Sequence, residues 1–179
     1  SVAGRFGHSI LELGGNNAIV VMDDANLDLA LRAILFAAVG TAGQRCTTLR
    51  RLIVQKGIHK KLLERLVKAY RSVPIGDPLE PGTLMGPLVN EAAVKDMMAA
   101  LAKVREQGGE IVAGGNRVDR PGWFVEPTIV KARQGLAIAE EETFAPILYV
   151  YEVEDLAEAV AIHNEVPQGL SSAIFTTSL

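Results

Sequence analysis

The first third of the chain alternates apolar and polar segments in a way that predicts a strand followed by a helix. The run at residues 17–21 (Asn-Ala-Ile-Val-Val) is short, apolar and rich in β-branched residues, which indicates a buried strand. Residues 23–26 supply short polar side chains that can accept the first free N–H groups of a helix. The helix itself is expected over residues 27–39, and we expect it to be buried because it is apolar on almost every side. Gly40 and Gly43 should end it, since glycine tolerates left-handed conformations.

The rest of the chain continues the same alternation. Apolar residues at helical spacing predict an amphipathic helix over 58–73, and a glycine- and proline-rich loop follows over 74–87. Asn90 is placed to cap a helix that reaches about Gln107. Further strands are predicted at 52–54, 111–113, 125–130, 147–153 and 172–176, with a short helix at 156–163. Strands alternating with helices predict an α/β fold with a mainly parallel sheet flanked by helices.

Composition narrows the class of protein further. The chain has 179 residues and 49% hydrophobic content, which predicts one domain with a well-buried core. The net charge of −3 and the scattered lysines and arginines argue against nucleic acid or an anionic membrane as a partner. The longest apolar stretch is shorter than the roughly 18 residues that suggest a membrane span. A single cysteine cannot form an intrachain disulfide, which favours a reducing, cytoplasmic location.

Two short segments contain residue types suited to covalent catalysis. Cys46 ends the segment Gly43-Gln44-Arg45-Cys46, and Glu12 lies in Leu11-Glu12-Leu13-Gly14-Gly15. A thiolate can attack a carbonyl and hold it covalently, and a carboxylate can activate water to release the product. The alternatives are that Cys46 is a small buried hydrophobic residue and that Glu12 is a solvated or ion-paired carboxylate. The glycines after Glu12 favour a functional role, because they allow the backbone to approach a ligand closely.

A third segment, Glu142-Thr143-Phe144-Ala145-Pro146, completes a set whose order and spacing resemble those of the aldehyde dehydrogenase superfamily. The resemblance runs along the whole chain and includes Gly76-Asp77-Pro78, Met85-Gly86-Pro87, Glu126-Pro127-Thr128 and Gly169-Leu170-Ser171. It implies that the predicted sheet is the Rossmann-like sheet of the catalytic domain in the aldehyde dehydrogenase fold.

The resemblance also implies a role for each matched residue. Cys46 corresponds to the nucleophile and Glu12 to the general base. Glu142 corresponds to the residue that binds the cofactor ribose, Phe144 to the one beside the nicotinamide, and Leu13 to a further cofactor contact. Without the resemblance, Glu142 would be interpreted as part of a solvated acidic patch and Phe144 as a core residue.

The implied reaction is NAD(P)-dependent oxidation of an aldehyde to a carboxylate. Cys46 attacks the aldehyde to give a thiohemiacetal, hydride transfer leaves a thioester, and Glu12 activates the water that hydrolyses it. The backbone N–H of Cys46 is expected to be one oxyanion donor. The expected cofactor is NAD, with NADP left open because the residues that read the ribose phosphate lie before Ser1.

Finer features resemble the aminoadipate-semialdehyde (antiquitin-like) branch of the superfamily. They are Asn16-Asn17, Gly43-Gln44-Arg45-Cys46-Thr47-Thr48, Ala145, and Val166-Pro167-Gln168-Gly169-Leu170-Ser171-Ser172. This resemblance implies a semialdehyde substrate from lysine catabolism, such as aminoadipate semialdehyde. In that branch the arginine before the cysteine helps to read the substrate carboxylate, a role that falls to Arg45 here, because a guanidinium matches a carboxylate in a two-point contact. The alternative for Arg45 is a structural ion pair.

The chain is expected to be only the thiol-bearing catalytic domain, residues 1–179, of a longer enzyme that forms homo-oligomers. No G-x-G-x-x-G phosphate loop is present, so the cofactor-binding region is expected before Ser1 and a further segment after Leu179. No charged-then-apolar leader follows Ser1. The three histidines lack metal-ligand spacing, and no metal is expected. Two alternatives stay open for the isolated segment: a folded but inactive module that binds no NAD, or a cofactor-independent thiol esterase.

Overall fold

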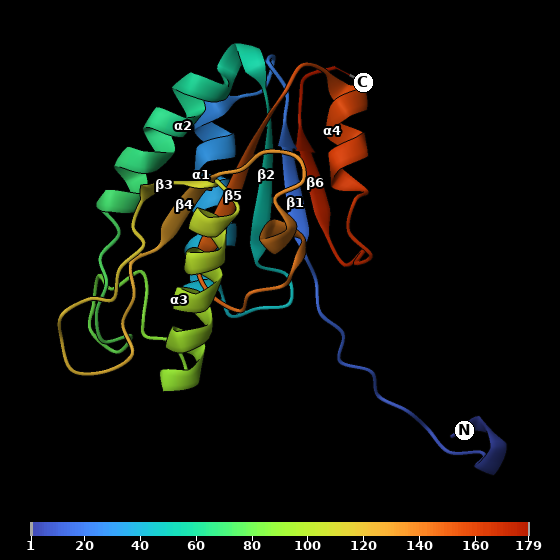
Figure 1. Cartoon of the computed structure of the whole chain (residues 1–179), viewed down its shortest axis with the longest axis vertical. Helices are drawn as coiled ribbons and strands as arrows, with labels where there is room; N and C mark the ends of the chain where they lie inside the picture. The colour runs from blue at the N-terminus through green and yellow to red at the C-terminus, as the bar shows by residue number, and fades with distance from the viewer. Residues whose placement is uncertain (1, 179) are drawn as a thin grey trace.

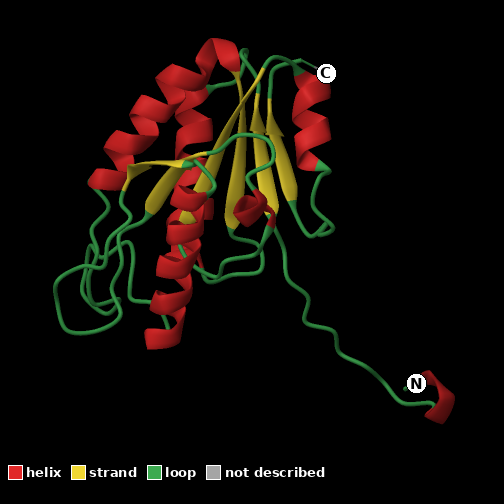
Figure 2. Ribbon diagram, viewed as in Figure 1, coloured by secondary structure: helices red, strands yellow, loops and turns green. Residues whose placement is uncertain are grey.

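A six-stranded sheet in the order β3-β4-β5-β2-β1-β6 forms the centre of the computed structural model, which describes residues 2–178. The strands are β1 (Asn17–Val21), β2 (Leu49–Gln55), β3 (Glu110–Ala113), β4 (Thr128–Lys131), β5 (Ile147–Val153) and β6 (Ser172–Phe175). Every neighbouring pair is parallel except β3 and β4, which are antiparallel. The predicted α/β fold with a mainly parallel sheet is therefore confirmed, as the ribbon in Figure 2 shows.

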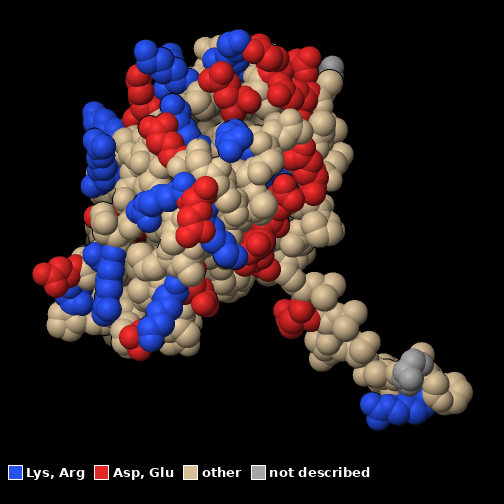
Figure 3. Space-filling view, viewed as in Figure 1, with Lys and Arg blue, Asp and Glu red and all other residues tan. Residues whose placement is uncertain are grey.

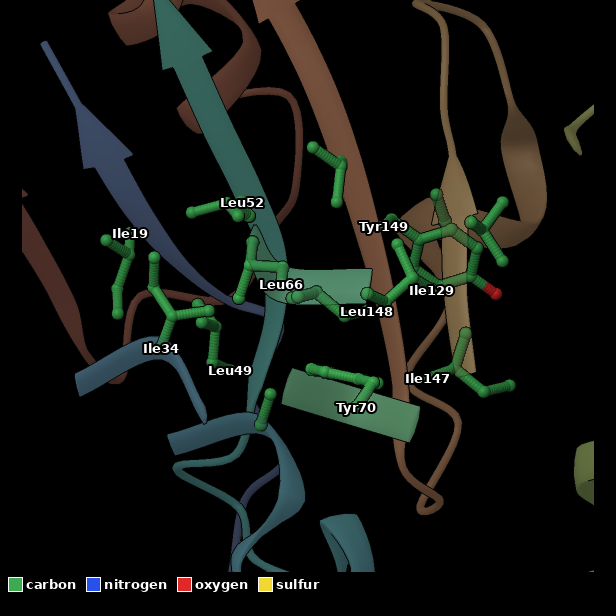
Figure 4. Packing of buried hydrophobic residues seen from close by; sticks show 14 of the residues in the cluster. Ile19, Ile34, Leu49, Leu52, Leu66, Tyr70, Ile129, Ile147, Leu148 and Tyr149 are labelled. Atoms are coloured by element: carbon green, nitrogen blue, oxygen red, sulfur yellow. The ribbon is translucent and has the colours of Figure 1, made fainter. Parts of the chain in front are cut away.

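Helices cover both faces of this sheet (Figure 1). They are α1 (Leu27–Val39), α2 (Lys56–Arg71), α3 (Glu91–Glu106) and α4 (Leu156–His163), with short 3₁₀ helices η1 (Ala3–Arg5), η2 (Gly40–Gly43) and η3 (Ala137–Glu140). Leu66 of α2 packs beside Leu52 of β2 in the core, and Ile34 of α1 belongs to the same cluster (Figure 4). Arg51, the preceding residue of β2, instead donates hydrogen bonds to the Ile162 and His163 carbonyls at the end of α4. Because neighbouring strand residues point to opposite faces, α4 lies on the face opposite α1 and α2.

Helix α1 confirms its predicted bounds but not its predicted burial. The side chain of Asn26 caps it by accepting hydrogen bonds from the Asp28 and Leu29 N–H groups, as the polar run before the helix predicted. The expectation that α1 is buried on every side is wrong, since Leu29 is 59% exposed and Phe36 is 69% exposed. Only the face of the helix that packs on the sheet and on α2 is buried, and apolar composition alone does not tell which face that is.

Helix α1 ends at Gly40 as predicted, but the conformation of the turn that follows differs in part from the prediction. Gly40 has φ −51° and is not left-handed, whereas Thr41 and Ala42 have φ of 53° and 52° and Gly43 has φ of 72°. Positive φ is uncommon for residues with a Cβ, and such strain tends to collect at functional sites. The strained turn leads directly into Gln44-Arg45-Cys46.

Four segments of the chain meet where the parallel strands begin. We call this row of strand amino-terminal ends the amino edge. Residues 14–15 precede β1, 46–48 precede β2, 142–146 precede β5 and 169–171 precede β6. These strands are parallel, so all four segments lie at the edge where the strands begin. Residues 2–13 form an arm that leaves the domain at this edge (Figure 1).

Candidate active site

Cys46 lies on the turn between η2 and β2, at the amino edge. Its side chain is exposed, so the alternative that Cys46 is a buried core residue is wrong. The carbonyl of Cys46 accepts a 2.7 Å hydrogen bond from Asn17 Nδ2, which also donates to the Thr48 carbonyl at 2.8 Å. Asn17 Oδ1 in turn accepts from the N–H and hydroxyl of Ser171. One buried amide therefore ties the turn with Cys46 to the starts of β1 and β6.

A second buried side chain, Arg50, holds the other side of this turn. Arg50 is 2% exposed, and it donates hydrogen bonds to the Arg45 carbonyl at 3.1 Å and the Thr48 carbonyl at 3.1 Å. Its Nε donates to the Thr143 carbonyl at 3.2 Å, in the segment before β5. Burial lowers the pKa of Arg50, while the nearby Glu142 carboxylate and Cys46 act in the opposite direction.

Glu142 joins the same cluster through an ion pair with Arg50, at 3.2 Å between Nη2 and Oε1. Its Oε1 also accepts a 3.2 Å hydrogen bond from the Gly15 N–H. The Glu142 side chain is 21% exposed, so the fully solvated alternative is wrong for this residue. Phe144 lies with its ring centroid 5.4 Å from the Arg50 guanidinium and is 47% exposed, so it is not a core residue.

The glycine pair Gly14-Gly15 fits between Cys46 and Glu142. A Cβ at Gly14 would overlap Oε2 of Glu142, and a Cβ at Gly15 would overlap the Cys46 carbonyl oxygen. Gly43 is similarly close to the Ala145–Pro146 backbone. The three segments selected from the sequence thus pack on one another, and the glycines in two of them are the residues that permit it.

Glu12 and Leu13 lie apart from this cluster. Both are exposed on the arm, and Leu13 is 70% exposed. Glu12 forms no ion pair with any residue between Val2 and Ser178. The structure therefore brings Gly14 and Gly15 to Cys46 but does not bring Glu12 there, and its role as general base stays a prediction.

Arg45 does not form the structural ion pair considered as its alternative role, at least within residues 2–178. Its Nε donates to the Thr41 hydroxyl at 3.0 Å, and its guanidinium lies 5.3 Å from the centroid of the exposed Phe36 ring. In the same described part of the chain, its two terminal nitrogens donate no hydrogen bond. The planar end of Arg45 thus remains able to pair with an added carboxylate.

Comparison with known proteins identifies the family. All residues, 1–179, match the model described as "Aldehyde dehydrogenase family". The chain belongs to the aldehyde dehydrogenase family. It is 53% identical over 176 residues to aldehyde dehydrogenase family 7 member A1 of Pisum sativum, and the match covers 98% of this chain but only 35% of that protein. It is 51% identical to the α-aminoadipic semialdehyde dehydrogenase of Mus musculus, covering 98% of this chain and 33% of that one.

Solved structures of family members confirm the fold. The lactaldehyde dehydrogenase of Escherichia coli superposes with a TM-score of 0.93 at 38% identity, over 99% of this chain and 38% of that one. The betaine aldehyde dehydrogenase of Staphylococcus aureus, solved in complex with NAD⁺, gives a TM-score of 0.93 at 30% identity, over 98% of this chain and 36% of that one. The chain thus spans little more than a third of the length of these dehydrogenases.

Two side chains at the amino edge, Glu142 and Phe144, have the chemistry needed to hold one end of a nicotinamide dinucleotide. Glu142 Oε2 lies against Gly14, in the space that a Cβ would fill, and accepts no hydrogen bond from residues 2–178, so its lone pairs remain able to accept from a hydroxyl group. The half-exposed ring of Phe144 beside it can pack against a flat heterocycle. The described residues contain no group of three or more His, Cys, Asp or Glu side chains placed to hold a metal. Among the same residues, no helix is long and apolar enough to cross a membrane.

Two residues of the site, Asn17 and Arg50, were not selected as functional from the sequence. Asn17 was noted only as a feature of the aminoadipate-semialdehyde branch, and Arg50 lies just before the strand predicted at 52–54. The available signal was a pair of arginines leading into an apolar strand, because charged side chains inside a sheet must be paired or hydrogen bonded.

Proposed function

We propose that the chain is the thiol-bearing catalytic domain of a longer aldehyde dehydrogenase that oxidises a semialdehyde to a carboxylate with NAD. The observation that supports this most strongly is the position of Cys46, exposed on a turn that two buried side chains, Asn17 and Arg50, hold against Glu142. A rigid support of this kind is what a nucleophile needs, because misplacement by about 1 Å can cost 100-fold in rate. The cofactor-binding region then belongs to sequence before Ser1.

Cys46 begins the reaction. Its thiolate sulfur adds to the aldehyde carbon, and the electron pair of the C=O bond moves to the oxygen, which becomes an oxyanion. The Cys46 N–H, which donates no hydrogen bond to residues 2–178, is available to stabilise that charge. The adduct is a thiohemiacetal in its alkoxide form. When the oxyanion re-forms the C=O bond, hydride leaves the carbon, and the product is the neutral thioester.

A nicotinamide dinucleotide supplies the hydride acceptor when it is bound. Glu142 would hold the ribose through its free Oε2, while its Oε1 stays with Arg50 and the Gly15 N–H. Phe144 would pack near the nicotinamide, and Leu13 would add an apolar contact from the arm. NAD, rather than NADP, is proposed by analogy with the NAD⁺ complex of the betaine aldehyde dehydrogenase.

Glu12 releases the product by activating the water that attacks the thioester carbonyl. This role requires the arm to take a different path from the one in Figure 1. Gly15 already lies against the Cys46 carbonyl, and three extended residues span only about 10 Å. Rotation at Gly14, which has no Cβ to restrict it, can therefore carry Glu12 toward Cys46.

The proposed substrate carries a carboxylate as well as an aldehyde, as aminoadipate semialdehyde does. Arg45 adjoins the nucleophile and has no carboxylate partner within residues 2–178, so its guanidinium can form the two-point contact that a substrate carboxylate offers. The relatives named for α-aminoadipic semialdehyde and the 51% identity to the mouse protein support this choice. A role in lysine catabolism, in the cytoplasm and as a homo-oligomer, is proposed with it.

The test is NADH production from aminoadipate semialdehyde by the full-length enzyme that contains this chain. We expect Cys46→Ser to abolish turnover and Thr47→Ala, a change at the exposed neighbouring residue, to preserve it. An aldehyde of equal length without the carboxylate should have a raised KM, and Arg45→Gln should remove that difference. NADH production that persists in Cys46→Ser would refute the proposal.

The isolated 179-residue chain is proposed to be a folded module without dehydrogenase activity. Most of the dinucleotide must be held elsewhere, since only the ribose and nicotinamide contacts lie at the amino edge. Calorimetric titration with NAD should therefore show no saturable binding, and a micromolar dissociation constant would contradict this. Because Cys46 is exposed, hydrolysis of p-nitrophenyl acetate by the chain, lost in Cys46→Ser, would instead reveal a cofactor-independent thiol esterase.

A further inference from the structure

Arg50 lies behind the peptide unit that contains the Cys46 N–H. The Arg45 carbonyl and the Cys46 N–H belong to the same planar unit and point in opposite directions. The Arg45 oxygen accepts hydrogen bonds from Arg50 Nη2 at 3.1 Å and from the Thr48 N–H at 3.0 Å. Two donors fixing one end of a rigid plane also fix the direction of the N–H at the other end.

The charge on Arg50 also strengthens the Cys46 N–H as a donor. A charged donor makes a stronger hydrogen bond than a neutral one, and hydrogen bonds linked through one peptide unit polarise each other. Arg50 is 2% exposed, so water does little to screen this effect. Four of its five N–H groups have partners, because the Thr48 and Thr143 carbonyls and Glu142 accept in addition to the Arg45 carbonyl. The guanidinium therefore has one well-defined position.

We propose that Arg50 is a positioning residue that orients and polarises the Cys46 N–H for the oxyanion. This inference rests on the proposed function, in which Cys46 adds to an aldehyde and the former carbonyl oxygen takes up the electron pair. Arg50 touches neither substrate nor sulfur in this scheme. It acts through the Arg45–Cys46 peptide. Its ion pair also joins that peptide to Glu142, the residue proposed to hold the ribose.

The chain offers a matched control in the next residue, Arg51. Arg51 is also 2% exposed, and burial lowers its pKa as it does that of Arg50. Its guanidinium donates to the carbonyls of Asn16, Ile162 and His163, on the α4 face of the sheet. A lysine at either position keeps the charge but loses the planar fork that reaches several carbonyls at once. Arg50→Lys and Arg51→Lys should therefore cost similar stability and differ only at the Cys46 turn.

Two reagents that react with Cys46 in the full-length enzyme separate an effect on the Cys46 N–H from a general loss of stability. A trifluoromethyl ketone analogue of the aldehyde forms a tetrahedral adduct whose oxygen needs the Cys46 N–H, whereas alkylation by iodoacetamide creates no oxyanion. Removal of an oxyanion donor costs about 100- to 1,000-fold in rate, so misdirection of a retained donor should cost about 10-fold or more. We expect Arg50→Lys to weaken binding of the ketone by about 10-fold or more. The rate of alkylation should stay within about twofold, and the pH dependence of that rate should not shift.

Arg51→Lys should lower the melting temperature but leave both the ketone affinity and the alkylation rate unchanged. The inference is overturned if Arg50→Lys binds the ketone as tightly as the unaltered enzyme, or if both Lys variants weaken adduct and alkylation in proportion to lost stability. A shifted alkylation pH profile in Arg50→Lys would also overturn it, because Arg50 would then act on the thiol itself. These outcomes differ from a failure of the proposed function, which would appear as turnover that survives Cys46→Ser.

Discussion

The amino edge of the sheet, where the parallel strands begin, differs from the opposite edge, where they end, in the side chains that it buries. Within residues 2–178, six of the seven buried polar or charged residues lie at or beside the strand starts, namely Asn16, Asn17, Thr48, Arg50, Arg51 and Thr128. The seventh, His59, is on α2. At the opposite edge, polar contacts such as Lys56 with Glu154 are exposed. The face in Figure 3 carries both signs of charge on its surface, so the contrast lies in what is buried.

This difference supports the proposal that the amino edge is the working end of the domain. Buried polar groups cost free energy unless they are hydrogen bonded, and a satisfied polar network makes its surroundings rigid. Ligand sites in open parallel sheets ordinarily lie at the carboxyl ends of the strands. Here the carboxyl ends of β1, β2 and β5 lead into helices. The segments with Cys46, Glu142 and the glycine pair enter the strands at the other end.

The strongest test of the contrast is Gly15→Ala. A methyl group at Gly15 would overlap the Cys46 carbonyl oxygen, which belongs to the backbone and cannot swing aside. The Cys46 turn must move, and we expect kcat of the full-length enzyme to fall by about 100-fold or more. Gly169→Ala is the control, because a Cβ there meets no atom within 4 Å. Equal activity in the two variants would show that the amino edge tolerates displacement.

Asn17 and Asp24 allow a direct comparison of the two edges, because each ties β1 to β6. Asn17 joins the strand starts through Ser171, and Asp24 joins the strand ends through Thr176 and Thr177. Asn17→Ala removes the buried donor to the Cys46 and Thr48 carbonyls, so it should lower the free energy of unfolding by about 1–3 kcal/mol and reduce kcat. The Asp24 carboxylate is fully exposed. Asp24→Ala should therefore change neither the free energy of unfolding, measured by chemical denaturation, nor kcat, measured in steady-state assays.

Gly14→Ala should separate cofactor binding from the nucleophile. A methyl group at Gly14 would overlap Glu142 Oε2, the end of a flexible side chain that can move. The carboxylate is then displaced from the ribose position, and we expect the KM for NAD to rise about 10-fold, the cost of roughly one charged hydrogen bond. The rate of Cys46 alkylation should not change. A large fall in alkylation would mean that the two glycines act as one unit.

The fold was largely predictable from hydrophobic periodicity. The bounds of α1, α4, β1 and β5 were predicted correctly, because each has a clear apolar pattern between polar or turn residues. Predictions missed where tertiary contacts override local pattern. Strand β2 begins at Leu49, not at residue 52, because Arg50 and Arg51 are paired inside the sheet. The left-handed Thr41 and Ala42 could not be inferred, since the strain is sustained by packing against other segments.

The candidate site was predictable in its residues but not in its connections. The order of the segments predicts Cys46 and Glu142, and the structure brings the Cys46 backbone and the Glu142 side chain to the same glycine pair. That each glycine faces a different partner depends on the register of β1 against β2, which no local pattern encodes. Glu12 is a different case, because its proposed role depends on the path of the arm rather than on the packed domain.

Among residues 2–178, His59 is the one buried polar residue that lies away from the amino edge, and it gives the smallest predicted effect. Burial lowers the pKa of His59 below 6.5, opposed by Glu152 at 2.8 Å and reinforced by Lys131. The unfolded chain therefore binds more protons than the folded one between the two pKa values, so stability is lost as pH falls below about 6.5. His59→Gln should flatten the dependence of unfolding free energy on pH between about 7 and 5, measured by urea denaturation. Glu152→Gln should steepen it, because loss of that carboxylate lowers the folded pKa further. Since His59 lies away from the amino edge, kcat should follow neither change, and a parallel loss of kcat would show that the two regions are coupled.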